Sequence, residues 1–231
     1  MLLARLDAAV AVALNHWGAG ASTAGPLLAW LVGADLVKTL PFLLLLVAAW
    51  HWAPLPRYRL VVVQGVLGAL LAMVLGRLLP LVLPYRARPL RDAELGLLLP
   101  PGVAPAALDG WTSFPSDHGL LCGALVGAVF ALHRRLGWLA LGFAAVVVWL
   151  PRLVLGYHYA TDIVAGALLG LGCAWLAQRP AARARAGQPL LALAARRPAG
   201  FHALAFLLLV QLAQLFGPLR TGLGLAWMAL R

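Results

Sequence analysis

Long apolar runs alternate along the chain with shorter connections that carry most of the polar residues. A helix that crosses a bilayer needs ~20 mostly apolar residues. The runs that meet this length, or nearly meet it, lie at about 35–52, 59–79, 118–133, 136–151, 159–178 and 201–216. Residues 1–33 differ, because Asn15, His16 and a Gly- and Ala-rich stretch would make a poor membrane centre. The pattern predicts an all-α polytopic transmembrane helical bundle of about six membrane helices, with interfacial helices at the N-terminus.

This pattern divides the chain into an interfacial segment at 1–34, a membrane domain at 35–216 and a C-terminal tail at 217–231. Composition supports a membrane protein, because 63% of the residues are hydrophobic and only 11% are charged. Such a chain lacks the polar residues needed to cover a soluble globule.

The formal net charge of +11 raises the question of a nucleic-acid partner. The basic residues are scattered between the apolar runs, however, so membrane topology explains them better and no nucleic-acid partner is expected. The two cysteines, Cys122 and Cys173, both fall inside apolar runs without metal-ligand spacing, which predicts small buried side chains.

Orientation follows from the distribution of arginine between the runs. Three connections carry basic residues and no Asp or Glu, and they are predicted to face the cytoplasm: those containing Arg57 and Arg59, His133 to Arg135, and residues 179–200. The alternate connections, 80–117 and 151–158, then face outward. They hold nearly all of the residues with candidate chemistry.

The stretch from Arg152 to Asp162 is the first candidate for chemistry, because charged residues are costly at a membrane edge. His158 and Asp162 are four residues apart, so a helix would place them on one face and the carboxylate could orient the imidazole. Arg152 could hold an anion next to that histidine. An ordinary ion pair at a helix start, with an interfacial arginine, is the structural alternative.

Two further outward clusters have the same ambiguity. Arg86, Arg88 and Arg91 precede a long loop and could grip an anionic group, or could simply anchor the chain at lipid headgroups. Pro115-Ser116-Asp117-His118 has good helix-start residues, which is consistent with simple capping. His118 on the membrane side of that turn, beside the free N–H groups of a helix start, favours a phosphate site.

Taken together, Arg88-Pro89, Pro115-Ser116-x-His118 and Arg152-(five residues)-His158-(three residues)-Asp162 resemble the motifs of the PAP2 superfamily of phosphatases. The resemblance covers about residues 60–178. It implies catalytic roles for His158 as the nucleophile that forms a phosphohistidine, Asp162 as its orienting partner and His118 as the general acid. It implies phosphate binding by Arg88, Arg152 and Ser116. It implies no metal or other cofactor.

The chain departs from the family pattern at three positions. Leu81 stands where the first motif usually has Lys, and Arg86 or Arg77 could replace that charge. Asp117 stands where the second motif usually has Gly. We expect Asp117 and Arg86 to belong to the phosphate-binding residues. Pro151 replaces a usual Ser.

Pro-Ser-Asp-His resembles the bacterial undecaprenyl-diphosphatase branch of the superfamily. The implied function is dephosphorylation of undecaprenyl diphosphate to undecaprenyl phosphate for recycling of the cell-wall lipid carrier. The implied location is the bacterial inner membrane, with the site facing the periplasm or outside. The expected partners are a polyprenyl or other lipid phosphate and membrane lipids. The alternatives are a phosphomonoesterase acting on phosphatidic acid, phosphatidylglycerophosphate or lipid A, and a non-enzymatic transporter or scaffold for anionic lipids.

Overall fold

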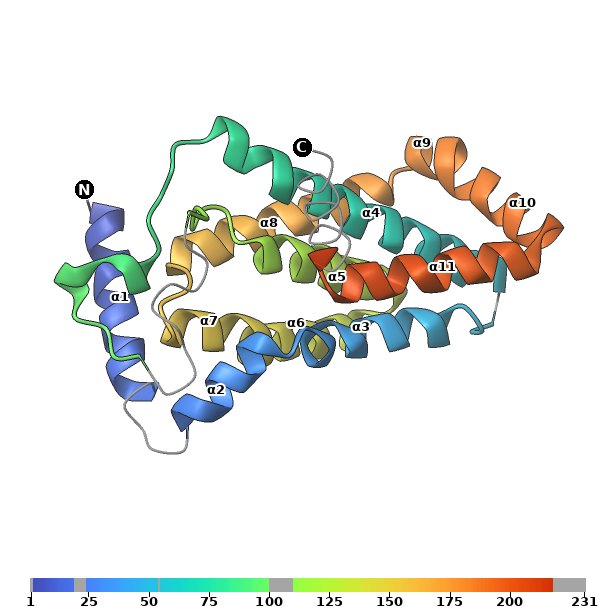
Figure 1. The fold of residues 1–231 in the computed structure, drawn as a ribbon. Helices are drawn as coiled ribbons and strands as arrows, with labels where there is room; N and C mark the ends of the chain where they lie inside the picture. The colour runs from blue at the N-terminus through green and yellow to red at the C-terminus, as the bar shows by residue number, and fades with distance from the viewer. Residues whose placement is uncertain (1, 19–23, 54, 100–109, 218–231) are drawn as a thin grey trace, which may run out of the picture.

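The computed structural model describes residues 2–18, 24–53, 55–99 and 110–217, and these residues form helices and connecting loops (Figure 1). The main helices are α1 (Leu2–Gly18), α2 (Ala24–Gly33), α3 (Asp35–Ala49), α4 (Leu55–Val82), α5 (Asp117–Leu132), α6 (Arg134–Phe143), α7 (Leu150–Val154), α8 (Ala160–Ala177), α10 (Gln188–Arg196) and α11 (Pro198–Ala213). The short elements are the 3-10 turns η1 (Pro89–Arg91) and η2 (Ala93–Leu95), the π-helical turns η3 (Ala144–Trp149) and η4 (Arg183–Gly187), and α9 (Pro180–Ala182). The predicted all-α helical bundle is confirmed.

The apolar helices differ in whether they are long enough to span a membrane. Three stretches of the described chain have both the length and the composition, namely Pro56–Val82, Arg134–Val154 and Ala160–Ala177. A fourth is possible if α2 and α3, which meet at a 60° bend, form one broken span. The remaining apolar helices, α5 and α11, have 16 residues each. All six predicted runs are therefore helical, but six full spans are not confirmed.

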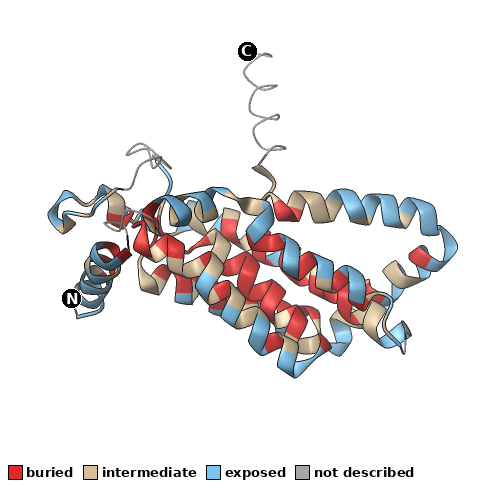
Figure 2. Cartoon of the chain, turned by 90° about the horizontal axis from the view of Figure 1, so that it is seen from below, coloured by how far each residue is buried: buried red, intermediate tan, exposed pale blue. Residues whose placement is uncertain are grey.

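The core lies where α4, α5 and α8 pack together. Buried residues concentrate on these helices (Figure 2), and α5 is buried along nearly its whole length. Glycines permit the close approach of α5 and α8. A Cβ atom on Gly170 would lie 2.1 Å from the carbonyl oxygen of Leu120, and one on Gly123 would lie 2.3 Å from the carbonyl oxygen of Ala167. Both cysteines are free and buried here, as the sequence predicted.

The N-terminal helices hold one end of this bundle. In Figure 1, α1 runs across the end at which α7 and α8 meet. Two of its polar residues, Asp7 and Asn15, face inward. The amide of Asn15 donates to the carbonyl oxygens of Leu98 (3.0 Å) and Val154 (2.8 Å). Asp7 is only 4% exposed and accepts hydrogen bonds from the start of α8. The first helix is thus fixed to the bundle by specific contacts.

Candidate active site

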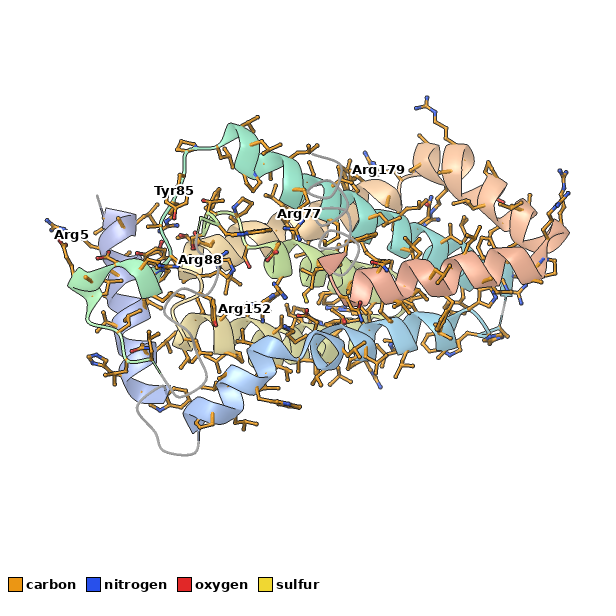
Figure 3. The ribbon with its side chains drawn as sticks, viewed as in Figure 1. Arg5, Arg77, Tyr85, Arg88, Arg152 and Arg179 are labelled. Carbon is orange, nitrogen blue, oxygen red and sulfur yellow. The ribbon has the colours of Figure 1, made fainter. Side chains whose placement is uncertain are left out.

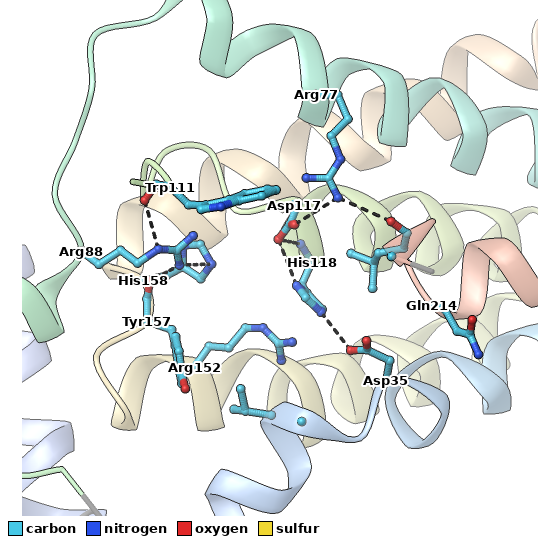
Figure 4. A pocket seen from close by; sticks show the side chains of 14 residues that line it. Asp35, Arg77, Arg88, Trp111, Asp117, His118, Arg152, Tyr157, His158 and Gln214 are labelled. Carbon is cyan, nitrogen blue, oxygen red and sulfur yellow. Dashed lines mark hydrogen bonds and ion pairs between the residues drawn. The ribbon is translucent and has the colours of Figure 1, made fainter. Parts of the chain in front are cut away.

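A cavity of about 370 Å³ opens at the same end of the bundle, between α4, α5, α7 and the bend that joins α2 to α3 (Figure 4). Its polar and aromatic lining residues are Asp35, Arg77, Arg88, Trp111, Asp117, His118, Arg152, Tyr157, His158 and Gln214. Figure 3 shows that Arg152 points into the interior of the bundle, whereas Arg5 projects away from it. The guanidinium groups of three lining arginines thus surround one cavity, which the imidazoles of two histidines also line: Arg77, Arg88, Arg152, His118 and His158.

A tight turn brings the first and third motifs together. Gly156 has a φ of 68°, a conformation that favours glycine. Its carbonyl oxygen accepts a hydrogen bond of 2.9 Å from the backbone N–H of Leu90, directly after the first motif. A Cβ atom at Gly156 would lie 2.7 Å from Leu97 and 3.1 Å from that backbone nitrogen. The turn consequently places Arg88 against His158, with 3.3 Å between Arg88 Nη1 and His158 Nε2.

His158 is held in one tautomer. Its Nδ1 lies 2.9 Å from the backbone carbonyl oxygen of Ser113, which can only accept a hydrogen bond, so Nδ1 carries the proton. Nε2 is then the basic nitrogen and lies on the cavity side, next to Arg88. Burial of the imidazole, together with the nearby Arg88 charge, holds the pKa of His158 well below its usual value. The ring is therefore neutral at pH 7, as a nucleophile requires.

Asp162 is connected to this histidine through Ser113. Its Oδ2 lies 3.9 Å from His158 Nδ1, beyond hydrogen-bond distance. It accepts hydrogen bonds instead from the Ser113 hydroxyl (2.5 Å) and the Tyr159 backbone N–H (2.8 Å). Because α8 begins only at Ala160, His158 precedes the helix and the expected shared face does not exist. Asp162 therefore fixes Ser113, and the carbonyl of Ser113 orients His158.

Arg86 faces this same network rather than the cavity. Its guanidinium pairs with Asp162 (Nη1 to Oδ1, 2.5 Å) and with Asp7 (Nη2 to Oδ2, 2.7 Å). Burial favours the neutral form, but the Asp7 hydrogen bond and the Asp162 charge outweigh it and raise the pKa of Arg86. Arg86 does not line the cavity. In this structure two carboxylates engage its donors, so phosphate binding by Arg86 stays a prediction and its observed contacts are those of an ion-pair network.

The second motif places His118 across the cavity from His158. His118 Nδ1 lies 3.0 Å from Asp117 Oδ1, and its Nε2 has no hydrogen-bond partner among the described residues. That Nε2 lies 3.6 Å from Asp35 Oδ1, so the carboxylates of Asp117 and Asp35 flank the two edges of the ring. Ser116 is fully buried and accepts from the N–H of Gly119, which is the capping role considered for it, and it does not line the cavity.

Arg152 and Arg88 are built into the cavity wall. Arg152 is 2% exposed, and Nη1 donates to the carbonyl of Val148 at 2.9 Å. Arg88 Nη1 donates to the Tyr157 carbonyl at 2.6 Å, and Nη2 donates to the Thr112 carbonyl at 3.2 Å. Backbone contacts of this kind fix guanidinium groups in advance, which suits them to stabilise a phosphoryl group.

Comparison of the sequence with known protein families identifies the family of this chain. Residues 61–185, just over half of the chain, match the model of the PAP2 superfamily. The chain belongs to the PAP2 superfamily. This membership, together with the apolar helices, makes it a multi-pass membrane protein of a lipid phosphatase family.

Curated relatives match only parts of this PAP2 chain. The bacitracin transport permease protein BcrC of Bacillus licheniformis is 44% identical over 59 residues, which cover 26% of this chain and 29% of that protein. The putative undecaprenyl-diphosphatase YbjG of Escherichia coli (strain K12) is 31% identical over 151 residues, 63% of this chain and 69% of that protein. Lipid A 1-diphosphate synthase of the same organism is 28% identical over 145 residues, 59% of this chain and 60% of that protein. The chain thus spans less than two thirds of two of these three relatives. No solved structure gives a significant match.

The two arginines considered as replacements for the missing lysine of the first PAP2 motif lie in different places. Leu81, which replaces it, is 77% exposed and lies outside the cavity. Arg77, one helical turn earlier on α4, lines the cavity. Of the two arginines considered as replacements, Arg77 lines the cavity, whereas Arg86 pairs with Asp7 and Asp162.

Several residues of the site escaped the sequence analysis. Asp7 and Ser113 support the PAP2 motifs from outside them, and Asp35 reaches His118 from α3. Asp35 also pairs with Lys38, with 2.5 Å between Oδ1 and Nζ. The available signal was an acidic residue inside an apolar helix, which is costly unless it has a partner. For Ser113 there was no such signal, because its contribution is a backbone carbonyl.

Proposed function

We propose that the protein dephosphorylates undecaprenyl diphosphate to undecaprenyl phosphate through a phosphohistidine on His158. The observation that carries the proposal is the fixed tautomer of His158, with Nδ1–H on the Ser113 carbonyl and basic Nε2 beside Arg88 at the cavity. A nucleophilic histidine needs a free lone pair next to groups that hold the phosphoryl oxygens. Arg88 and Arg152 supply these groups.

The first chemical step transfers the phosphoryl group to the enzyme. The lone pair on His158 Nε2 forms a bond to the terminal phosphorus, and the bond from that phosphorus to the bridging oxygen breaks. The bridging oxygen keeps the electron pair and leaves with the lipid phosphate, while protonated His118 donates its Nε2 proton to it. Arg88 and Arg152 stabilise the charge that spreads over the equatorial oxygens.

The second step restores the enzyme. His118, now neutral, takes a proton from a water molecule as that water attacks the phosphohistidine. The P–N bond breaks, its electron pair returns to His158 Nε2, and inorganic phosphate leaves. The guanidinium groups already supply positive charge here, so we propose that the reaction needs no metal ion.

The proposed identity of the lipid is argued from relatives and from the form of the second motif. YbjG is named as a putative undecaprenyl-diphosphatase, and the Pro-Ser-Asp-His form of the second motif resembles that branch. A phosphomonoesterase is the second candidate, because another relative is the phosphatidylglycerophosphatase B of Bacillus subtilis, 33% identical over 81 residues. With the basic connections in the cytoplasm, the site would face the periplasm or outside of a bacterial inner membrane.

The test is phosphate release by the purified protein in detergent with EDTA present. Undecaprenyl diphosphate, phosphatidic acid and phosphatidylglycerophosphate are compared at equal concentration. His158→Ala should abolish release, whereas the matched control His133→Ala should retain it, because His133 is exposed at the connection between α5 and α6. Preference for the diphosphate supports the proposal, and preference for a monoester supports the second candidate. If no lipid is hydrolysed, or if His158→Ala stays active, the proposed chemistry is wrong.

A further inference from the structure

A second cavity, of about 540 Å³, lies between α3, α4, α10 and α11, at the end of the bundle away from α1 (Figure 1). Its walls are apolar, with Leu46 from α3, Val66 from α4 and Leu209 from α11. We propose that this groove binds an anionic phospholipid, with an acyl chain along the helices and the phosphate at Arg197. The inference is independent of the proposed hydrolysis, because the groove contains none of the motif residues.

The polar side chains of the groove gather at one end. His51 follows α3, Arg197 precedes α11 and His202 lies in the first turn of α11, and all three are exposed. Beside them the ring of Trp50 stacks on that of Phe201, with 5.7 Å between the centroids, and the His202 ring packs edge-on against both at 5.6 Å. Aromatic rings next to a basic connection are typical of the level at which helices meet lipid headgroups.

The helices that form the groove carry no negative charge near this end. The sequence has no Asp or Glu between residues 36 and 91 or after residue 162, and α4, α10 and α11 lie entirely within these ranges. Arg197 therefore brings a positive charge to an apolar groove without an acidic side chain next to it in these helices. A phosphodiester would supply the missing charge and would accept hydrogen bonds from the guanidinium group.

The length of the groove fits an acyl chain in one leaflet of a bilayer. On α11 the lining residues extend from Phe201 to Leu209, which corresponds to ~12 Å along the helix axis. One leaflet contributes ~15 Å to the hydrocarbon core of a membrane. A lipid with its phosphate at Arg197 would thus have much of one acyl chain inside the groove.

The last turn of α11 separates this groove from the catalytic cavity. Leu212 and Ala213 are only 1% and 2% exposed, and the Thr39 hydroxyl donates to the Ala213 carbonyl oxygen at 3.1 Å. Within the described chain, no residue lines both cavities. The lipid in the groove is therefore a molecule other than the substrate.

The closing experiment measures lipid binding to the purified full-length protein in a neutral detergent by native mass spectrometry. Dioleoyl phosphatidylglycerol and dioleoyl phosphatidylcholine are titrated separately, because they share their acyl chains and differ in headgroup charge. Arg197→Gln removes the cation, and Arg185→Gln is its control, since Arg185 is exposed on the same basic connection but outside the groove. Ala205→Trp fills the groove, and Ala203→Trp is its control on the same helix.

The unaltered protein should bind phosphatidylglycerol about fivefold more tightly than phosphatidylcholine, and Arg197→Gln should remove this preference. Ala205→Trp should weaken binding of both lipids, whereas both control variants should bind as the unaltered protein does. An unchanged Tm without added lipid checks that each variant is folded. Equal affinity for the two lipids in the unaltered protein, or equal losses in Arg197→Gln and Arg185→Gln, would overturn the inference. A dimer that Ala205→Trp dissociates would also overturn it, because a second copy of the chain would then occupy the groove.

Discussion

Replacement of Arg86 by alanine should lower the free energy of unfolding without weakening the affinity of the protein for its phosphate substrate. The guanidinium compensates two carboxylates, Asp7 at 4% and Asp162 at 0% side-chain exposure. Removing one partner of a buried ion pair costs ~3–5 kcal/mol. Because Arg86 itself is 30% exposed, the lower end applies, and the free energy of unfolding should fall by about 3 kcal/mol. For a chain of this size that corresponds to a Tm lower by roughly 6–12 °C.

The assay measures Tm in detergent together with kcat and KM for phosphate release at a temperature where the variant remains folded. KM should stay within about twofold, because Arg86 does not line the cavity. The value of kcat should fall, because Asp162 loses the pair that fixes it against Ser113. Arg86→Lys should recover part of the stability, and Arg57→Ala, at an exposed position, should change it by less than ~0.5 kcal/mol. A tenfold rise in KM at unchanged Tm would refute this reasoning and return Arg86 to phosphate binding.

Three further predictions concern pH, packing and the general acid. Since the pKa of His158 is held well below 6.5 in the folded protein, the acidic limb of kcat/KM should begin well below pH 6.5; a tenfold loss per pH unit starting at 6.5 would contradict this. By the same linkage the unfolded chain binds the proton first, so the free energy of unfolding should decrease as pH falls below 6.5, by up to ~1.4 kcal/mol per unit. Gly170→Ala should lower Tm in thermal melts, because its Cβ would lie 2.1 Å from a backbone carbonyl oxygen of α5, whereas Gly172→Ala, with open space around it, should not. Asp35→Asn should reduce hydrolysis of a lipid monoester more than that of a diphosphate, because it removes the carboxylate that faces Nε2 of the proposed general acid His118 and only the monoester expels a poor leaving group; equal losses would remove that role.

The sequence predicted the helical bundle and the residues that could meet, but not the contacts between them. Apolar runs define helices locally, and spaced motifs on one side of a membrane predict a shared site. The direction in which the side chain of a loop arginine points depends on its ion-pair partners, which can lie far away in the sequence. Arg86 is therefore drawn to Asp7 and Asp162, whereas Arg77, from the middle of a helix, reaches the cavity.

The orientation of His158 shows a second limit of the same kind. Spacing alone suggested a direct bond to Asp162, because four residues complete a helical turn. The helix begins two residues after His158, so the ring turns toward a backbone carbonyl instead. A backbone acceptor has no side-chain signature, and no sequence motif could have identified Ser113.

The contacts of the first helix determine how short a fragment of this protein can be made without disturbing the site. The family match begins at residue 61, yet Asp7 and Asn15 on α1 brace the ends of α7 and α8 from outside it. A fragment cut to the family boundaries would retain every motif residue and lose the contacts from α1 that hold the ends of α7 and α8 on either side of His158. The smallest unit that keeps this site intact is thus expected to be larger than the region matched by the family, and to include the N-terminal helix.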